Sequence, residues 1–217
     1  MSTERDFRPT SSTELPSYTN RLIRKQHVRW KEIIDVQAPY RWNLQNLNPG
    51  FTLDLGCGIG RNLKHLRGQG VGIDHNPESV RVAQNRGLIA FTPEEFIASS
   101  FCHPEQFDTI LLAHVAEHMK TRETIELLAN YLPYLAPDGK LVMITPQEAG
   151  FKSDDTHVEF VDFDKLRHIG EQLNLSIVKE YSFPFPRFAG HLFVYNEFVA
   201  IFLKPNNTKP GHHGNAS

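Results

Sequence analysis

The sequence contains only two cysteines, Cys57 and Cys102, among 217 residues. Two cysteines cannot form the disulfide framework of a small secreted domain, and their scarcity suits a reducing compartment. The chain also has no run of about 20 apolar residues, the length that a transmembrane helix needs. Its N-terminal stretch is polar and lacks the apolar core of a signal peptide. These absences predict a cytoplasmic protein that does not associate with a membrane.

An excess of charge of either sign is missing as well. The 23 Lys and Arg residues nearly balance the 25 Asp and Glu residues, which gives a formal net charge of -2. Nothing global therefore favours a nucleic acid or an acidic membrane surface as a partner. We expect a small-molecule substrate, and the composition leaves the oligomeric state open.

Both ends of the chain have few apolar residues. The N-terminal stretch is rich in Ser, Thr and Pro, and the C-terminal stretch in Pro, Asn, Gly and His. Such segments cannot bury enough apolar surface to offset the conformational entropy that is lost on ordering. We therefore expect a flexible segment over residues 1–20, one domain over 21–205 whose residues 21–48 form an N-terminal helical cap, and a disordered tail over 206–217.

Short β-type runs alternate with helical patterns through the middle of the chain. The predicted strands are residues 50–55, 70–74, 87–92, 107–113 and 140–145, and the predicted helices are 21–45 (interrupted at Pro39), 61–67, one beginning at 77, 93–99, 119–135 and 163–173. This alternation favours right-handed βαβ units and an open parallel sheet covered by helices. Two further strands, at 175–183 and 191–205, leave no room for a crossover helix, so we expect them to pair as an antiparallel hairpin.

The stretch TLDLGCGIGRN joins the first predicted strand to the helix that follows it. Its glycines, Gly56, Gly58 and Gly60, let the backbone approach a ligand closely and aim amide N–H groups at it. Their spacing, G-x-G-x-G, differs from the G-x-G-x-x-G dinucleotide fingerprint. The carboxylate of Asp54 would repel a pyrophosphate but can accept hydrogen bonds from an ammonium group. The loop thus favours a cationic, amino-acid-like ligand.

A second acid, Asp74, ends the next predicted strand, 18 positions after Gly56. A carboxylate at this position can accept both ribose hydroxyl protons of an adenosine-containing ligand. The alternative is that Asp74 caps the helix that begins at NPESV, a role that Asn76 could fill instead.

The motifs also occur in a specific order. LDLGCGIG, GVGID, FDTILLAHVAEHM and LAPDGKLVMITP resemble the successive motifs of class I S-adenosylmethionine-dependent methyltransferases, over about residues 51–204. The resemblance implies S-adenosylmethionine as the cofactor. It also implies a Rossmann-like α/β fold with helices on both faces of a seven-stranded, mostly parallel sheet that ends in an antiparallel hairpin. By position, it assigns Asp54, Gly56, Gly58 and Gly60 to the methionine end of the cofactor, Asp74 to the ribose, Thr92 to the adenine and His114 to the cofactor side.

Methyl transfer to a hydroxyl also requires removal of the acceptor's proton. The segment FKSDDTHVEF, just beyond the fifth predicted strand, brings acids and a histidine together. Because an imidazole suits general-base catalysis near neutral pH, we predict His157 as the base and Asp155 as the carboxylate that orients its ring. Two alternatives stay open: the segment only shapes a turn, or Asp154, Asp155 and His157 hold a divalent ion such as Mg²⁺.

Three other segments carry candidate residues. Glu117 and His118 follow the fourth strand, where a helix cap and a packing histidine are the favoured interpretation and His118 is a second candidate for substrate contact. In the loop FPFPRFAG, aromatic residues surround Arg187, a composition that suits stacking on a sugar ring and pairing with an anionic group. The tail pair HH at 212–213 offers a metal ion too few ligands, so we favour a solvated tail and commit to no metal site.

The leading hypothesis is an O-methyltransferase of a small molecule. A faint similarity to bacterial enzymes of sugar or polysaccharide methylation points to a sugar or polysaccharide precursor as the acceptor. One alternative is N- or C-methylation, although AHVAEH stands where an NPPY-type tetrapeptide for nitrogen methylation would be. The others are a non-catalytic S-adenosylmethionine-binding module and a dinucleotide oxidoreductase, which would need the third glycine one position later.

Overall fold

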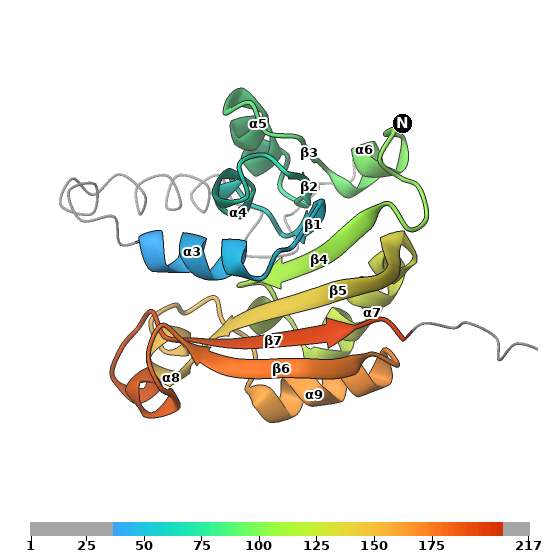
Figure 1. Cartoon of the computed structure of the whole chain (residues 1–217). Coiled ribbons are helices and arrows are strands. Elements are labelled where there is room, and N and C mark those ends of the chain that lie inside the picture. Colours follow the sequence, from blue (N-terminus) through green and yellow to red (C-terminus); the bar gives the residue numbers. More distant parts are fainter. Residues whose placement is uncertain (1–36, 206–217) are drawn as a thin grey trace, which may run out of the picture.

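A computed structural model describes residues 37–205, which form a seven-stranded sheet in the order β3-β2-β1-β4-β5-β7-β6 (Figure 1). The strands are β1 Thr52–Leu55, β2 Gly70–Ile73, β3 Ala90–Phe91, β4 Phe107–Ala113, β5 Leu135–Pro146, β6 Ser176–Phe183 and β7 Glu197–Leu203. β1 to β5 run parallel to one another, and β7 pairs antiparallel with both β5 and β6. The predicted Rossmann-like sheet with a C-terminal antiparallel hairpin is confirmed.

Helices cover both faces of this sheet (Figure 1). They are α3 Ala38–Asn46, α4 Arg61–His65, α5 Pro77–Asn85, α6 Pro93–Ile97, α7 Thr121–Tyr131, α8 Glu148–Phe151 and α9 Phe163–Gln172, with short 3₁₀ helices η1 Ala116–His118, η2 Leu132–Tyr134 and η3 Arg187–His191. In β4, Ile110 and Leu112 pack in a core that includes residues of α6, α7 and α9, whereas Leu111 and Ala113 pack with residues of α3 and the end of α4. Burial on both faces explains why β4 is almost wholly apolar.

The boundaries of several elements differ from the prediction. The third strand shortens to Ala90–Phe91, and the helix expected over 119–135 ends at Tyr131. Pro133 follows in η2, because proline has no N–H for an α-helical bond. The sequence APDG lies inside β5, where a register shift separates the first pair from the pair that joins Thr109 to Lys140.

The last strand also begins later than predicted. It was expected over 191–205 but starts at Glu197, because the preceding residues fold into η3 and a turn. Asn196 is fully buried and fixes that turn. Its side-chain oxygen accepts a hydrogen bond from the Phe185 amide at 3.0 Å, and its side-chain nitrogen donates to Gln147 Oε1 at 2.9 Å.

Most of the predicted terminal features cannot be compared with the structure. The flexible segment 1–20, residues 21–36 of the helical cap, and the tail 206–217 lie outside the described residues. Within the cap, α3 begins at Ala38 with Pro39 in its first turn, where the fixed backbone of proline suits a helix start. Among residues 37–205, no helix combines the length and apolarity that crossing a membrane would require.

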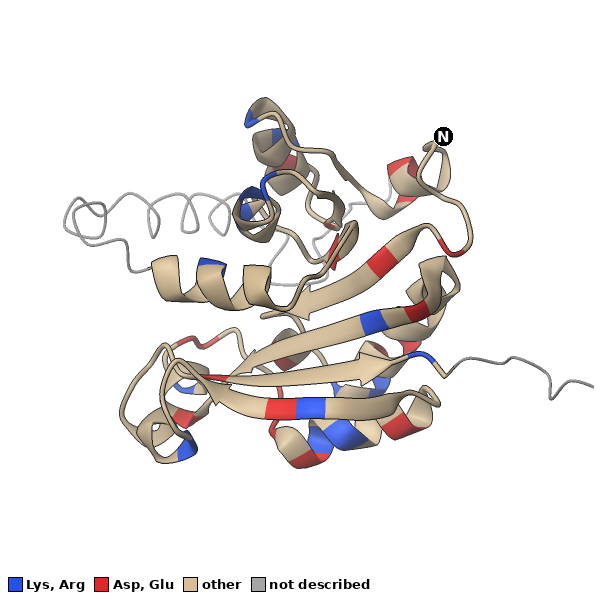
Figure 2. Ribbon diagram, in the orientation of Figure 1, with Lys and Arg blue, Asp and Glu red and all other residues tan. Residues whose placement is uncertain are grey.

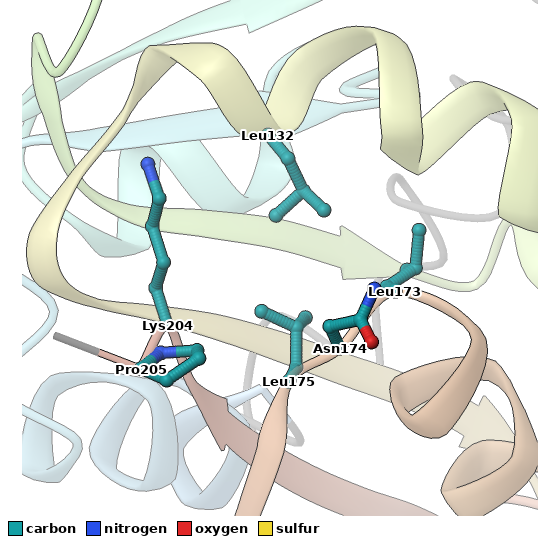
Figure 3. Close-up of a pocket in the computed structure, with 6 residues that line it drawn as sticks. All are labelled: Leu132, Leu173, Asn174, Leu175, Lys204 and Pro205. Carbon is teal, nitrogen blue, oxygen red and sulfur yellow. The ribbon is translucent and has the colours of Figure 1, made fainter. Parts of the chain in front are cut away.

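Two hollows lie at the amino ends of the parallel strands, opposite the glycine loop. The smaller, of about 170 Å³, is lined by Leu132, Leu173, Asn174, Leu175, Lys204 and Pro205 (Figure 3). The larger, of about 760 Å³, includes Gly50, Phe51 and Asp108. Ligands of open α/β sheets bind beyond the carboxyl ends of the strands, so neither hollow corresponds to the expected cofactor site.

The close approach of α9 to β7 gives a first prediction. A Cβ added to Gly170 would lie 2.3 Å from Cε1 of Phe202. Alanine forms helices better than glycine by up to about 1 kcal/mol, but overpacking typically costs roughly 1–3 kcal/mol. We therefore expect Gly170→Ala to lower the free energy of unfolding in urea titrations. Adding Phe202→Leu should recover part of that loss, and strictly additive effects of the two changes would contradict the contact.

Candidate active site

The glycine loop follows β1 and meets the turn that follows β4. Gly56 and Gly60 have φ angles of +72° and +82°, in the left-handed region that side chains rarely adopt. A Cβ on Gly56 would lie 2.4 Å from a methyl carbon of Val115, and one on Gly60 would lie 2.3 Å from a methyl carbon of Leu88. Glycine is therefore required for both backbone conformation and close packing, and the loop lies directly against the carboxyl end of β4.

Asp74 links the glycine loop to the end of β2. Its Oδ2 accepts a hydrogen bond from the Gly58 amide at 2.7 Å, and its Oδ1 accepts one from the Asn76 amide at 2.9 Å. Asn76 is the residue that caps α5, because its side chain accepts from the amides of Glu78 and Ser79. Asp74 therefore does not cap that helix. Each of its oxygens retains a further lone pair that could accept a ribose hydroxyl.

Asp54 is a buried carboxylate with an unsatisfied oxygen. Its exposed fraction is 0%. Oδ1 accepts a hydrogen bond from Asn62 Nδ2 at 3.3 Å, whereas Oδ2 has no hydrogen-bond partner in the described structure. Burial raises the pKa of Asp54 to about 7, although Asn62 and Arg61 favour its charged form. An ammonium group at the loop would supply the missing partner, so these residues fit the methionine end of S-adenosylmethionine.

Thr92 lies at the end of β3 and caps α6. Its hydroxyl accepts a hydrogen bond from the Glu95 amide at 3.3 Å, and Glu95 Oε2 accepts one from the Thr92 amide at 2.9 Å. This reciprocal pair is a capping box. Because the Thr92 hydroxyl is hydrogen-bonded as the N-cap of α6, an adenine contact at this position would have to use other atoms of Thr92.

His114, directly after β4, lies between two acids. Its Nε2 is 2.8 Å from Glu197 Oε1, and its Nδ1 is 3.3 Å from Glu117 Oε1. Burial disfavours the charged ring, but the contacts with Glu117 and Glu197 outweigh burial and raise the pKa of His114 to about 9. The ring is therefore an imidazolium at neutral pH, at the carboxyl edge where the sequence predicted a residue on the cofactor side.

Glu117 connects the two segments that carry the acceptor-side candidates. Its side chain is 1% exposed, and neither of its oxygens accepts a hydrogen bond in the described structure. Its main-chain carbonyl accepts hydrogen bonds from the amides of Val158 at 2.7 Å and Glu159 at 3.2 Å. The turn after β4 is thus fastened to the loop after α8, which brings the AEH and DDTH segments together.

His118 and His157 face each other across this junction, with ring centroids 4.9 Å apart. Nδ1 of His118 lies 3.2 Å from the carbonyl oxygen of Thr156, and Nδ1 of His157 lies 2.6 Å from that of Phe151. A carbonyl oxygen only accepts hydrogen bonds, so each Nδ1 carries a proton and each Nε2 has a free lone pair. Burial lowers the pKa of His118, which keeps that ring neutral.

The predicted pairing of Asp155 with His157 is wrong. Asp155 is exposed, and the group that orients the His157 ring is the Phe151 carbonyl. Asp154 shapes the intervening turn by accepting hydrogen bonds from the amide and the hydroxyl of Thr156 at 3.1 and 2.7 Å. Among the described residues, the metal-compatible group that contains His157 is formed with Glu117 and His118 instead of the two aspartates.

Arg187 is paired within the chain. Its guanidinium makes two hydrogen bonds to the Glu148 carboxylate, one of them at 2.8 Å, and lies 4.7 Å from the ring centroid of Phe198. Burial favours the neutral form of Glu148, but the hydrogen bonds from Arg187 hold its pKa below the usual value. The position predicted for an anionic group of the substrate is therefore filled by Glu148.

Sequence reasoning missed Glu197 and underestimated Glu117. Glu197 contacts His114 across 83 positions of the chain, and its surroundings in the sequence indicate only a strand. Glu117 could have been predicted as a site residue, because it is adjacent to His118 and closely follows a buried strand. Interpreting Glu117 as a helix cap gave no reason to expect that its side chain is buried.

The buried carboxylate of Asp54 predicts how stability depends on pH. The ordinary pKa of this group is 3.8 and its folded value is about 7. Between these values the unfolded chain is ionised while the folded chain keeps the proton, so the free energy of unfolding falls as pH rises. Asp54→Asn removes this effect. The stability of the variant relative to wild type should grow by on the order of 3 kcal/mol from pH 4 to pH 8, at about 1.4 kcal/mol per pKa unit.

Urea titrations without cofactor at several pH values measure this difference. Asp155→Asn, which removes an exposed carboxylate, is the matched control and should leave the pH profile unchanged. A difference between Asp54→Asn and wild type that does not vary with pH would contradict the burial argument.

Comparison with known proteins identifies the family of the chain. The profile of the family described as "Methyltransferase domain" matches residues 22–197. A tRNA U34 carboxymethyltransferase of Pseudoalteromonas translucida is 29% identical over 124 residues, which are 50% of this chain and 37% of that protein. An uncharacterized methyltransferase of Alkaliphilus oremlandii is 26% identical over 137 residues, which are 60% of this chain and 61% of that protein. The chain thus spans less than two thirds of the length of either relative.

The fold is shared with solved methyltransferase structures. A TehB-like S-adenosylmethionine-dependent methyltransferase from Corynebacterium glutamicum superposes with a TM-score of 0.62 at 19% identity, over 88% of this chain and 100% of that one. At this identity the likeness concerns the fold alone, and the matched profile and the ordered motifs identify the family. The chain belongs to the methyltransferase-domain family, among the class I methyltransferases whose cofactor is S-adenosylmethionine.

Proposed function

We propose that this chain transfers the methyl group of S-adenosylmethionine to a hydroxyl of a small molecule, with a sugar or polysaccharide precursor as the acceptor. The observation that supports this proposal is the pair His118 and His157, each with Nε2 free, beside the buried carboxylate of Glu117. A hydroxyl must lose its proton as it accepts a methyl group, and this cluster offers the groups that can assist that loss.

The cofactor side is supported by the residues of β1, β2 and the glycine loop. When bound, S-adenosylmethionine supplies a methyl group activated on a sulfonium. Asp54 Oδ2 is the unpartnered acceptor for the α-ammonium group, and Asp74 is the acceptor for the ribose hydroxyls. His114 and Thr92 remain proposed contacts at the carboxyl ends of β4 and β3.

The packing of the glycine loop indicates where the methyl acceptor would bind. Because Gly56 packs against Val115, the loop that would hold the cofactor lies beside the turn that carries Glu117 and His118. Alignment of donor and acceptor supplies much of the rate enhancement in such a displacement. The glycine loop follows β1, and Glu117 and His118 follow the adjacent strand β4, so the sheet can hold donor and acceptor in line.

Exposed aromatic rings near the same edge support a sugar-like acceptor. Phe185, Phe188 and Tyr195 are 48%, 75% and 52% exposed. They lie in the segment between β6 and β7, which α3 contacts through a 2.6 Å hydrogen bond from the Tyr40 hydroxyl to the Tyr195 carbonyl. Aromatic faces suit stacking on the apolar face of a sugar ring. Arg187 would contact the acceptor as part of its ion pair with Glu148, and not as an unpaired cation.

The distribution of charge favours a small acceptor over a nucleic acid. In Figure 2, the Lys and Arg residues of α9 and β6 lie among Asp and Glu residues. Arg167, for example, pairs with both Asp164 and Glu180. A polyanion would need a continuous basic surface. The scarcity of cysteine supports a cytoplasmic location as part of the same proposal.

The chemistry of the product tests the proposed acceptor. The full chain is incubated with S-adenosylmethionine carrying a ¹³C-labelled methyl group and with fractionated metabolite and glycan extracts. We expect a new ¹³C resonance typical of a methyl ether, because the acceptor atom is a hydroxyl oxygen. A resonance typical of N-methyl or C-methyl carbon, or label appearing in added tRNA, would reject this proposal. A chain that binds S-adenosylhomocysteine but labels nothing would support the non-catalytic module instead.

His157 should be needed for turnover but not for cofactor binding. Once an acceptor is known, we expect His157→Ala to lower kcat by about 100-fold or more, the range of general acid-base contributions, with the Kd for S-adenosylhomocysteine unchanged. The exposed His168 on α9 provides the matched control, and His168→Ala should behave as wild type. Wild-type turnover by His157→Ala would remove this residue from the mechanism.

A further inference from the structure

We propose that Glu117, His118 and His157 form a binding site for a divalent transition-metal ion of the Zn²⁺ class, whose open position takes the acceptor's hydroxyl oxygen. Each residue offers one ligand atom, and these atoms all lie within 4.8 Å of one another. Two imidazoles and one carboxylate are the protein ligands of many catalytic zinc sites, which keep a further position open for substrate or water. The sequence alone had pointed to a different group, Asp154 and Asp155 with His157.

The carboxylate of Glu117 is the first observation that requires a cation. It is 1% exposed and accepts no hydrogen bond in the described structure. A buried carboxylate oxygen without a hydrogen bond is costly, and a nearby cation compensates it. Oε1 of Glu117 lies 3.3 Å from Nδ1 of His114, whose Nε2 lies 2.8 Å from Glu197, so this one ring faces both acids. Oε2 of Glu117 has no partner in the described structure.

The two histidines are oriented as metal ligands are. Each donates its Nδ1–H to a main-chain carbonyl, His118 to Thr156 and His157 to Phe151. A hydrogen bond from one ring nitrogen to a carbonyl fixes the tautomer and leaves the other nitrogen free to ligate, and this arrangement usually accompanies metal-bound histidine. The pattern occurs twice, in adjacent rings, and both rings belong to the same three-residue group.

The backbone holds the three ligands close enough to converge. The hydrogen bonds from the Val158 and Glu159 amides to the Glu117 carbonyl fasten one ligand-bearing segment to the other. Ligand atoms around a tetrahedral Zn²⁺ lie about 3.3 Å apart, given bonds of about 2.0–2.1 Å. Ligand atoms that lie within 4.8 Å of one another would have to move closer together when an ion binds.

The ligand types select the class of ion. Mg²⁺ prefers an octahedron of oxygens, whereas imidazole nitrogens suit Zn²⁺ and its neighbours in the first transition row. Two of the three ligands here are imidazoles, so the ion we propose is Zn²⁺-like rather than the Mg²⁺ considered from the sequence.

The role of the ion rests on the proposed function. A hydroxyl bound to the ion has a lowered pKa and releases its proton to water. An electron pair of that oxygen then forms the new bond to the methyl carbon, while the carbon–sulfur bond breaks and its electron pair stays on sulfur. In this scheme His157 acts as a ligand of the ion rather than as a free base.

Metal binding can be measured without an acceptor. The full chain is first given His212→Ala and His213→Ala, which remove the histidine pair of the tail as a competing chelator. After EDTA treatment and dialysis, it is titrated with Zn²⁺ by calorimetry and with Co²⁺ by visible absorption. We expect one ion per chain, with Mg²⁺ binding at least tenfold more weakly. Glu117→Gln and His157→Ala should weaken Zn²⁺ binding by about 100-fold, whereas His168→Ala should not.

Binding of S-adenosylhomocysteine by every variant shows that it is folded. Unchanged Zn²⁺ binding in folded Glu117→Gln and His157→Ala would overturn the site, as would methylation that continues at full rate in EDTA. If metal binding follows the expected pattern but the transferred methyl group is found on nitrogen or carbon, the metal site stands and the proposed function fails. If a methyl ether forms in EDTA, the proposed function stands and the metal site fails.

Discussion

Two carboxylates buried at the carboxyl edge of one parallel sheet, Asp54 and Glu117, govern the arrangement of this site. Asp54 has one oxygen without a hydrogen-bond partner, and Glu117 has two. Burying such groups opposes folding unless a charge arrives to compensate them. In the proposed function Asp54 accepts a hydrogen bond from the cofactor's ammonium group, and in the proposed metal site Glu117 is a ligand. Both carboxylates therefore fit a protein in which bound ligands supply the compensating positive charge.

The sheet brings these two groups near each other. Asp54 on β1 is in register with Leu111 on β4, and β4 leads into the turn that carries His114, Glu117 and His118. Parallel strands end at the same edge, so residues that follow them converge there. The close packing of Gly56 on Val115 then sets the distance between the cofactor loop and the acceptor cluster.

Local patterns in the sequence predicted the features that depend on local physics. The glycine loop, the strand that leads into it and the acid at the end of β2 follow from backbone conformation and from burial on both faces of a strand. The antiparallel pairing of the last two strands was predicted because the segment between them is too short for a crossover helix. The residues predicted to bind the cofactor, Gly56, Gly58, Gly60 and Asp74, accordingly lie together, since Asp74 accepts a hydrogen bond from the Gly58 amide.

The features that sequence could not predict depend on side-chain direction and on distant contacts. Asp155 is two positions from His157, yet in the turn shaped by Asp154 its side chain is exposed to solvent. The His157 ring bonds to the Phe151 carbonyl instead. Glu197 reaches His114 only because β7 inserts between β5 and β6. Arg187 meets Glu148 because η3 packs on α8, and nothing in the sequence around either residue indicates that pair.

A crystal structure of the full chain with S-adenosylhomocysteine tests this account most directly. The account predicts that the α-amino nitrogen lies within hydrogen-bonding distance of Asp54 Oδ2 and that the sulfur faces Glu117, His118 and His157. A cofactor whose amino group points away from Asp54, or whose sulfur lies on the far side of β4 from those three residues, would contradict it.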